Sequence, residues 1–224
     1  MTLTPEQRQH LANVQQAAWE IGQSVAAILE AEQAPPTPTT PWIDRVAEMP
    51  IDAHPDHPDI VAAKLSFWRS RQLSQITGIT IHHTMSDSPL ATAQYCTRSV
   101  KSGGKGYPST QYQFWVSQGD NCPVYLLAPL DWAIWHDHTG GHPTTISIGM
   151  AGDLSKIAPP TDQIEATARL VVWLMQVYKI PLAEVRGHNE RAIERGYKTD
   201  CPGWKIRSWR LAFFTALGAV TRPV

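Results

Sequence analysis

The chain has 224 residues, a formal net charge of −1 and Lys and Arg residues that are scattered along its length. This length predicts one well-buried domain with additional pieces. The near-neutral charge argues against long-range attraction to nucleic acid and against a polybasic membrane patch. No run of about 18 apolar residues is present that would form a membrane span. The amino terminus has no basic stretch before an apolar run, so we expect no signal peptide.

Three cysteines, Cys96, Cys122 and Cys201, form no recognisable disulfide framework. Because the count is odd, at least one thiol must be free, bound to a ligand or paired outside the chain. We therefore expect a fold without structural disulfides.

Residues 1–33 are predicted to form an N-terminal helix. Thr4 suits the capping position, Pro5 the first helical position, and Gln7 completes a capping box. Apolar residues then recur from Leu11 to Ile28 at alternating steps of three and four, which is the spacing of a coiled-coil seam. Packing on the rest of the chain and self-association through this helix are equally compatible with so short a seam.

Residues 34–74 are predicted to form a Pro-rich linker and an irregular arm. The stretch APPTPTTP cannot continue a helix, because proline lacks a backbone donor and favours extended conformations before it. His54 and His57 lie in the run DAHPDHPD, which is more typical of a solvated, turn-rich segment than of a metal site.

Residues 75–224 are predicted to form the core domain, with strands and helices alternating along the chain. We expect strands at 78–82, 112–117, 124–127, 146–150 and 185–188. We expect one helix that Ser88 caps, with Pro89 at its first position, a second helix that Thr161 caps, and a third over 204–217. The second and third of these strands form a predicted hairpin. The fold class is therefore α/β, a mixed central β-sheet flanked by helices, with an added N-terminal helix and Pro-rich linker.

Three side chains in this core have the chemistry of a zinc site. His82 ends a predicted strand in ITIHHT, His188 follows another in RGHNE, and Cys201 precedes a Pro-Gly turn. Zinc accepts neutral imidazole and thiolate, and a catalytic site uses three protein ligands, which leaves a position for water. Because side chains alternate along a strand, His83 should point away from His82. From the residues alone, Cys201 could equally be a small buried apolar residue.

Five motifs in order give the chain a family resemblance. These are ITIHHT, YPSTQYQFWVSQGD, WHDHTGGHPTTISIGMAGD, RGHNE and TDCPGW. Together they resemble the type 2 N-acetylmuramoyl-L-alanine amidase family, which includes phage amidase endolysins, bacterial amidases and peptidoglycan recognition proteins. The resemblance covers about Gln75 to Trp209, and it implies a zinc amidase domain over 75–224 with a mixed sheet.

Carried over residue by residue, the resemblance implies Zn²⁺ as the cofactor, with His82, His188 and Cys201 as the metal ligands. Tyr112 resembles the family tyrosine beside the zinc-bound water. Thr199 stands where many relatives have lysine and amidase-active recognition proteins have threonine. Both are expected to be catalytic, and His136 is expected to border the substrate groove.

The resemblance implies a hydrolase that cleaves the amide bond between N-acetylmuramic acid and L-alanine in peptidoglycan or muropeptides. Two other functions remain open at this point, a non-catalytic peptidoglycan-binding module and a zinc peptidase that cuts the stem peptide. Without a signal peptide, we expect either a bacteriolytic phage lysin that is released to the cell wall or a cytoplasmic enzyme.

Overall fold

The computed structural model describes residues 40–62, 70–136, 143–194, 196–203 and 212–218. The predicted N-terminal helix at 1–33 lies outside the described residues, as does most of the predicted helix at 204–217. Within the described part, residues 212–218 are helical. No helix among the described residues is both long and apolar enough to cross a bilayer.

Six strands form one mixed sheet in the order β1-β4-β3-β5-β2-β6. Their bounds are β1 Ile43–Asp44, β2 Gly78–His83, β3 Phe114–Val116, β4 Val124–Leu126, β5 Thr145–Met150 and β6 Val185–Gly187. β3 and β4 pair antiparallel as a hairpin, and the other pairs are parallel. The predicted mixed sheet and its hairpin are therefore confirmed.

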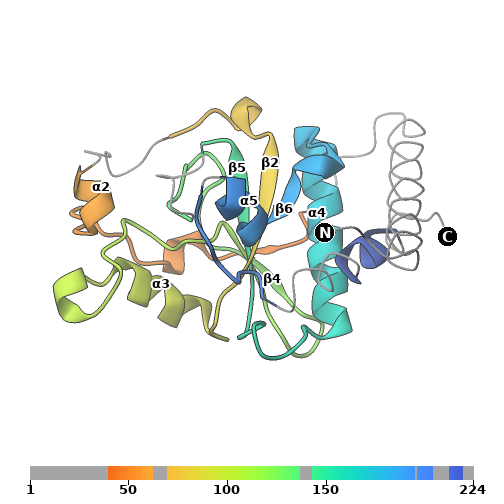
Figure 1. Cartoon of the computed structure of the whole chain (residues 1–224), viewed down its shortest axis with the longest axis horizontal. Coiled ribbons are helices and arrows are strands. Elements are labelled where there is room, and N and C mark those ends of the chain that lie inside the picture. Colours follow the sequence, from red (N-terminus) through yellow and green to blue (C-terminus); the bar gives the residue numbers. More distant parts are fainter. Residues whose placement is uncertain (1–39, 63–69, 137–142, 195, 204–211, 219–224) are drawn as a thin grey trace, which may run out of the picture.

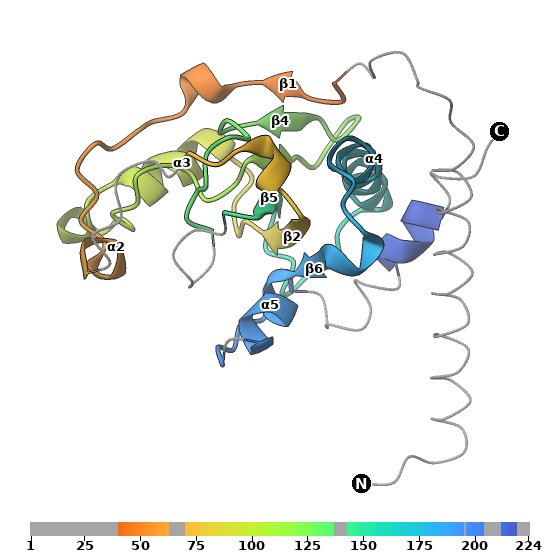
Figure 2. The same ribbon diagram turned by 90° about the horizontal axis from the view of Figure 1, so that it is seen from above.

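Helices cover both faces of this sheet (Figure 1). They are α2 Pro58–Ala62, α3 Pro89–Thr97, α4 Thr161–Tyr178 and α5 His188–Glu194, with short 3₁₀ turns at Val46–Glu48, Leu73–Gln75, Val100–Ser102 and Leu182–Glu184. Seen along the sheet, α3 and α4 lie on opposite sides of it (Figure 2). The predicted flanking helices are confirmed.

The start of α4 differs from the prediction. Thr161 is the first helical residue rather than the cap, and Pro160 precedes it without a side-chain capping bond. The prediction for α3 holds, since the Ser88 side chain accepts a hydrogen bond from the Ala91 N–H and Pro89 begins the helix.

Strand alternation gives each face of the sheet its own buried cluster. Ile79, Ile81, Phe114 and Val116 pack with the apolar face of α4, whereas Trp115 packs on the other face with Ala93 of α3. Since neighbouring residues of a strand face opposite ways, His82 lies on the same side of β2 as Thr80, opposite Ile81. The sheet thus directs His82 toward the face that carries α3.

Part of the predicted irregular arm belongs to the sheet. β1 pairs with β4 at the sheet edge, and Trp42 contacts Phe114 and Trp173 with ring centroids 4.9 and 4.7 Å away. Arg71 is 4% exposed. Packing thus continues across residue 75, the expected start of the core domain, and we propose that the folded unit begins near residue 41.

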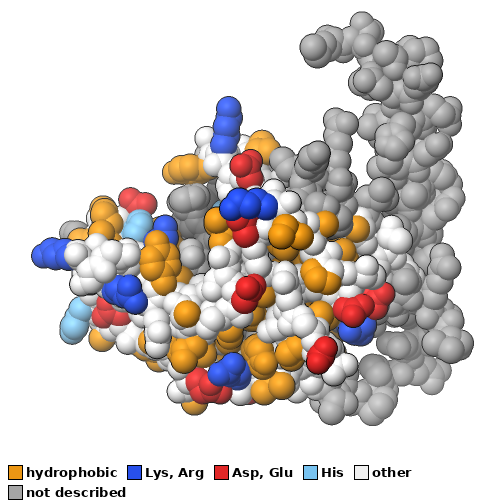
Figure 3. Space-filling view, turned by 90° about the horizontal axis from the view of Figure 1, so that it is seen from below, with side chains coloured by type: hydrophobic (Ala, Val, Ile, Leu, Met, Phe, Trp, Pro, Cys, Tyr) orange, Lys and Arg blue, Asp and Glu red, His pale blue; other side chains and the backbone are white. Residues whose placement is uncertain are grey.

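The cysteines and the charged side chains can be compared with what the composition suggests. All three cysteines are buried, and none of them forms a disulfide. On the face shown in Figure 3, acidic and basic side chains alternate, and neither sign gathers into a patch.

Candidate metal centre

Parallel pairing of β2 and β6 brings His82 and His188 together. The register places Ile81 opposite Gly187, so the next residues are His82, near the carboxyl end of β2, and His188, directly after β6. The two rings lie 4.6 Å apart between centroids. Side chains at the carboxyl ends of neighbouring parallel strands meet at one sheet edge, which explains how residues more than 100 positions apart become neighbours.

Cys201 reaches the same point from the loop after α5. Its Sγ lies 3.6 Å from Nδ1 of His82 and accepts a hydrogen bond from the His83 backbone N–H at 3.4 Å. The Cys201 carbonyl accepts from the Asn189 N–H at 2.7 Å, which ties the loop to the first turn of α5. Burial raises the pKa of the Cys201 thiol to about 12, so a nearby cation is needed to stabilise the thiolate at neutral pH.

His82, His188 and Cys201 are the one group of three or more His, Cys, Asp or Glu side chains in the described part of the chain that could hold a metal ion. One ligand atom from each lies within 4.8 Å of the others. His82 is 2% exposed and Cys201 8% exposed, while His188 is half-buried. The structure therefore brings together the three residues that the sequence singled out.

Tyr112 lies beside this group, two residues before β3. Its ring centroid is 5.6 Å from that of His82, and its hydroxyl donates to the His83 carbonyl at 3.3 Å. Burial, followed by the proximity of Cys201, holds the pKa of Tyr112 well above its ordinary value. The hydroxyl consequently stays protonated and can act as a hydrogen-bond donor.

Gly149 makes room for the Tyr112 ring. It pairs with His82 in the β2–β5 register, and a Cβ at this position would lie 2.8 Å from Cγ of Tyr112. A larger residue would push the tyrosine away from the site. The sequence carried a signal for this role, because Gly149 lies within one of the recognised motifs, but only the strand register reveals its partner.

Thr199 and His136 occupy different places around the group. The Thr199 hydroxyl accepts from the Cys201 N–H at 3.2 Å, so its own proton can be donated elsewhere. His136 is 2% exposed, and its Nδ1 lies 3.3 Å from Nε2 of His82.

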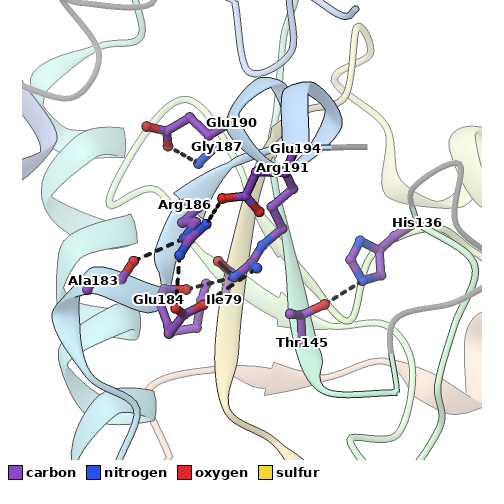
Figure 4. A network of polar contacts seen from close by, with 10 residues as sticks. All are labelled: Ile79, His136, Thr145, Ala183, Glu184, Arg186, Gly187, Glu190, Arg191 and Glu194. Carbon is purple, nitrogen blue, oxygen red and sulfur yellow. Dashed lines mark hydrogen bonds and ion pairs between the residues drawn. The ribbon is translucent and has the colours of Figure 1, made fainter. Parts of the chain in front are cut away.

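An ion-pair network holds α5, and with it His188, against the sheet (Figure 4). Arg191 is 9% exposed and donates to the carbonyls of Ile79 at 3.2 Å and Glu184 at 2.8 Å. The Glu190 side chain accepts from the Gly187 N–H at 2.7 Å, which fixes the turn from β6 into α5. Sequence reasoning did not point to Arg191, since a single arginine on a short helix has no distinctive pattern.

The chain resembles known proteins in both sequence and structure. Residues 72–204, more than half of the chain, match the profile of the N-acetylmuramoyl-L-alanine amidase family. A comparison with curated protein sequences gives no match.

Similar solved structures include the Ph2119 endolysin from a Thermus scotoductus bacteriophage, with 21% identity and a TM-score of 0.50 over 70% of this chain and 94% of that chain. PGRP-SA from Apis mellifera has 15% identity and a TM-score of 0.54 over 75% of this chain and 94% of that chain. A Drosophila PGRP-LB mutant in complex with tracheal cytotoxin has 14% identity and a TM-score of 0.50 over 76% of this chain and 94% of that chain. At these identities the structures establish the shared fold, and the profile match establishes the family. This chain belongs to the N-acetylmuramoyl-L-alanine amidase family and is a peptidoglycan amidase.

Proposed function

We propose that the chain is a zinc-dependent hydrolase that cleaves the amide bond between N-acetylmuramic acid and L-alanine. The observation that carries this proposal is the convergence of His82, His188 and Cys201, with ligand atoms within 4.8 Å of one another. Two imidazoles and one thiolate are a zinc ligand set that keeps a fourth position open for catalysis.

The spacing of the donor atoms supports zinc in particular. Bonds of about 2.0–2.1 Å to nitrogen and about 2.3 Å to sulfur, at a tetrahedral angle, separate the two ligand atoms by about 3.6 Å. The separation of Nδ1 of His82 from Sγ of Cys201 is 3.6 Å. These two side chains could therefore bind one ion without rearrangement. Hard cations such as Mg²⁺ prefer oxygen ligands and fit this donor set poorly.

Zinc bound there would act as a Lewis acid at the amide carbonyl and make water nucleophilic at neutral pH. The Tyr112 hydroxyl, which donates to the His83 carbonyl in this structure, would turn its one hydrogen bond to the attacking water or to the oxygen on which negative charge develops. Thr199 would supply a second donor on the Cys201 side of the site, because its hydroxyl oxygen already accepts from the Cys201 N–H.

The substrate assignment rests on the family. Peptidoglycan or a muropeptide would occupy the site, with the lactyl amide beside the two donors. The resemblance implies that His136 borders the substrate groove, and a released lysin would act at the cell wall. Release as a phage lysin and action in the cytoplasm both remain predictions.

Mass analysis of digested peptidoglycan tests this function against its alternatives. The zinc-loaded protein should release intact stem peptides that begin with L-alanine and leave the glycan strands whole. Stems that are cut internally would instead identify a peptidase. Unchanged peptidoglycan, with the protein bound to it, would identify a binding module.

A further inference from the structure

His136 makes a buried contact with the proposed ligand His82. Nε2 of His82 lies 3.3 Å from Nδ1 of His136, and Nε2 of His136 lies 3.0 Å from the Thr145 hydroxyl. Figure 4 shows the His136 ring directed at Thr145 of β5. The three side chains thus form a continuous row that ends on the ring of a proposed metal ligand.

If His82 binds zinc, as the proposed function requires, the N–H protons of His82 and His136 can be arranged in only one way. The inference therefore rests on the proposed function. The His82 nitrogen nearest Cys201 is Nδ1, so Nδ1 is the atom that faces the metal. A neutral imidazole carries one N–H, which must then be at Nε2 and can donate to Nδ1 of His136. His136 in turn carries its own proton at Nε2 and donates to the Thr145 oxygen.

We propose that His136 is a positioning residue for the metal centre. It accepts the Nε2–H of His82 and thereby fixes the tautomer and the ring orientation that zinc requires. Ligating histidines commonly donate their second N–H to such a partner, which orients the ring and makes it a better ligand. This role differs from the substrate contact that the family resemblance implies for the same residue.

The far end of the row is anchored, which is what a positioning role needs. The Thr145 carbonyl accepts from Nη1 of Arg71 at 2.5 Å, and Nε of Arg71 donates to the Leu130 carbonyl at 2.8 Å. Thr145 also pairs with Gly78 at the start of β2, the strand that carries His82. Since Thr145 and His136 are 3% and 2% exposed, water competes little for these hydrogen bonds.

The test compares His136→Leu, which fills the space but cannot accept, with His136→Asn, whose side-chain oxygen can accept. The zinc dissociation constant is measured by competition with a fluorescent chelator. We expect His136→Leu to weaken zinc binding by about 10- to 100-fold, and His136→Asn to stay within about threefold of the wild type. His57→Leu is the matched control, because its ring contacts Tyr107 and Trp135 rather than His82, and it should leave the constant unchanged.

A second measurement follows the proton itself. In the zinc-loaded wild type, ¹⁵N-imidazole NMR should show a slowly exchanging proton on Nε2 of His82. That proton should exchange rapidly in His136→Leu. Thr145→Val keeps the shape of residue 145 while it removes the acceptor for His136. Thr145→Val should weaken zinc binding by less than His136→Leu does. If His136→Leu does not fold, the zinc affinity of Thr145→Val tests the positioning role of His136.

The outcomes separate this inference from the proposed function. A folded His136→Leu variant with wild-type zinc affinity and a raised KM would overturn the positioning role and favour the substrate contact. If His136→Leu does not fold, wild-type affinity in Thr145→Val would overturn the role as well. Failure of the wild-type chain to bind zinc would instead reject the proposed function.

Discussion

The hydroxyl of Tyr112 is one functional atom on a well-packed side chain, and Tyr112→Phe removes that atom alone. If the hydroxyl stabilises charge that develops during the reaction, kcat should fall by about 10²- to 10³-fold, or roughly 2.7–4 kcal/mol. KM should change little, because the ground-state amide carries no such charge. Steady-state kinetics on a soluble muropeptide, together with the zinc content of the variant, measure both effects.

Tyr125→Phe is the matched control for this variant. Tyr125 lies on β4 and is only partly buried, so removal of its hydroxyl should leave kcat unchanged. A fall of less than about threefold in Tyr112→Phe with zinc retained would show that Tyr112 only packs against the sheet.

Variants of the two adjacent histidines test which of them faces the metal. His82→Ala should abolish turnover and zinc binding, as should His188→Ala. His83→Ala should retain most of the turnover, because the contact of His83 with Cys201 is made by its backbone N–H. Zinc content and turnover of the three purified variants are the measurements, and equal loss in all three would contradict the predicted alternation along β2.

At the scale of single residues, sequence identifies those whose chemistry is distinctive. A histidine after an apolar strand and a cysteine before a Pro-Gly turn stand out in the motifs, and the structure brings His82, His188 and Cys201 together. The contacts of Gly149 and His136 could not be predicted, because they depend on the strand register and on how the segment with His136 packs against β2 and β5. Such contacts involve residues far apart in sequence and have no local signal.

Among the secondary-structure elements, α5 depends most on one side chain. Arg191→Met should lower the free energy of unfolding by about 1–3 kcal/mol, because the carbonyls of Ile79 and Glu184 lose a charged donor in a buried setting. Zinc affinity should fall with it, since His188 begins the helix that Arg191 holds.

Arg169→Met is the control for the loss of unfolding free energy expected in Arg191→Met. Arg169 lies on the exposed face of α4, where its side chain is 53% exposed and 3.7 Å from Glu165. Exposed pairs of this kind contribute little, so the free energy of unfolding should change by less than about 0.5 kcal/mol. Urea unfolding of both variants measures the difference, and equal losses would contradict the role given to Arg191.

Helices and strands are predicted correctly where residues nearby in the sequence determine them. They are missed where contacts with distant residues determine them. Ser88 and Pro89 begin α3 as predicted, because a capping side chain acts on the backbone next to it. The sequence predicts an irregular arm, yet β1 pairs with β4. A strand of two residues has no periodicity to detect, and only its partner strand defines it.

At the scale of the whole molecule, the packing of the arm predicts where the chain can be shortened. Removal of residues 1–41 keeps Trp42 and β1, so it should leave a folded, zinc-binding hydrolase. Removal of residues 1–74 deletes the buried residues Met49, Ile60 and Arg71 and should abolish cooperative unfolding. Circular dichroism and thermal melts of the two shortened chains compare them, and a stable fold in the second would contradict the boundary near residue 41.

The same shortened chain tests self-association through the predicted N-terminal helix. If the Leu11 to Ile28 seam pairs between copies, sedimentation should find the full chain as an oligomer and the chain without residues 1–41 as a monomer. If both chains are monomers, self-association through the seam is excluded. Packing of the predicted helix on the rest of the chain then remains.

The central claim is that hydrolysis depends on zinc held by His82, His188 and Cys201. The most direct measurement is zinc content and peptidoglycan hydrolysis on one preparation, before chelation, after it, and after zinc is returned. The predicted result is about one zinc per chain, loss of activity with the metal, and recovery of both together. A metal-free preparation that hydrolyses peptidoglycan at the undiminished rate would contradict the account.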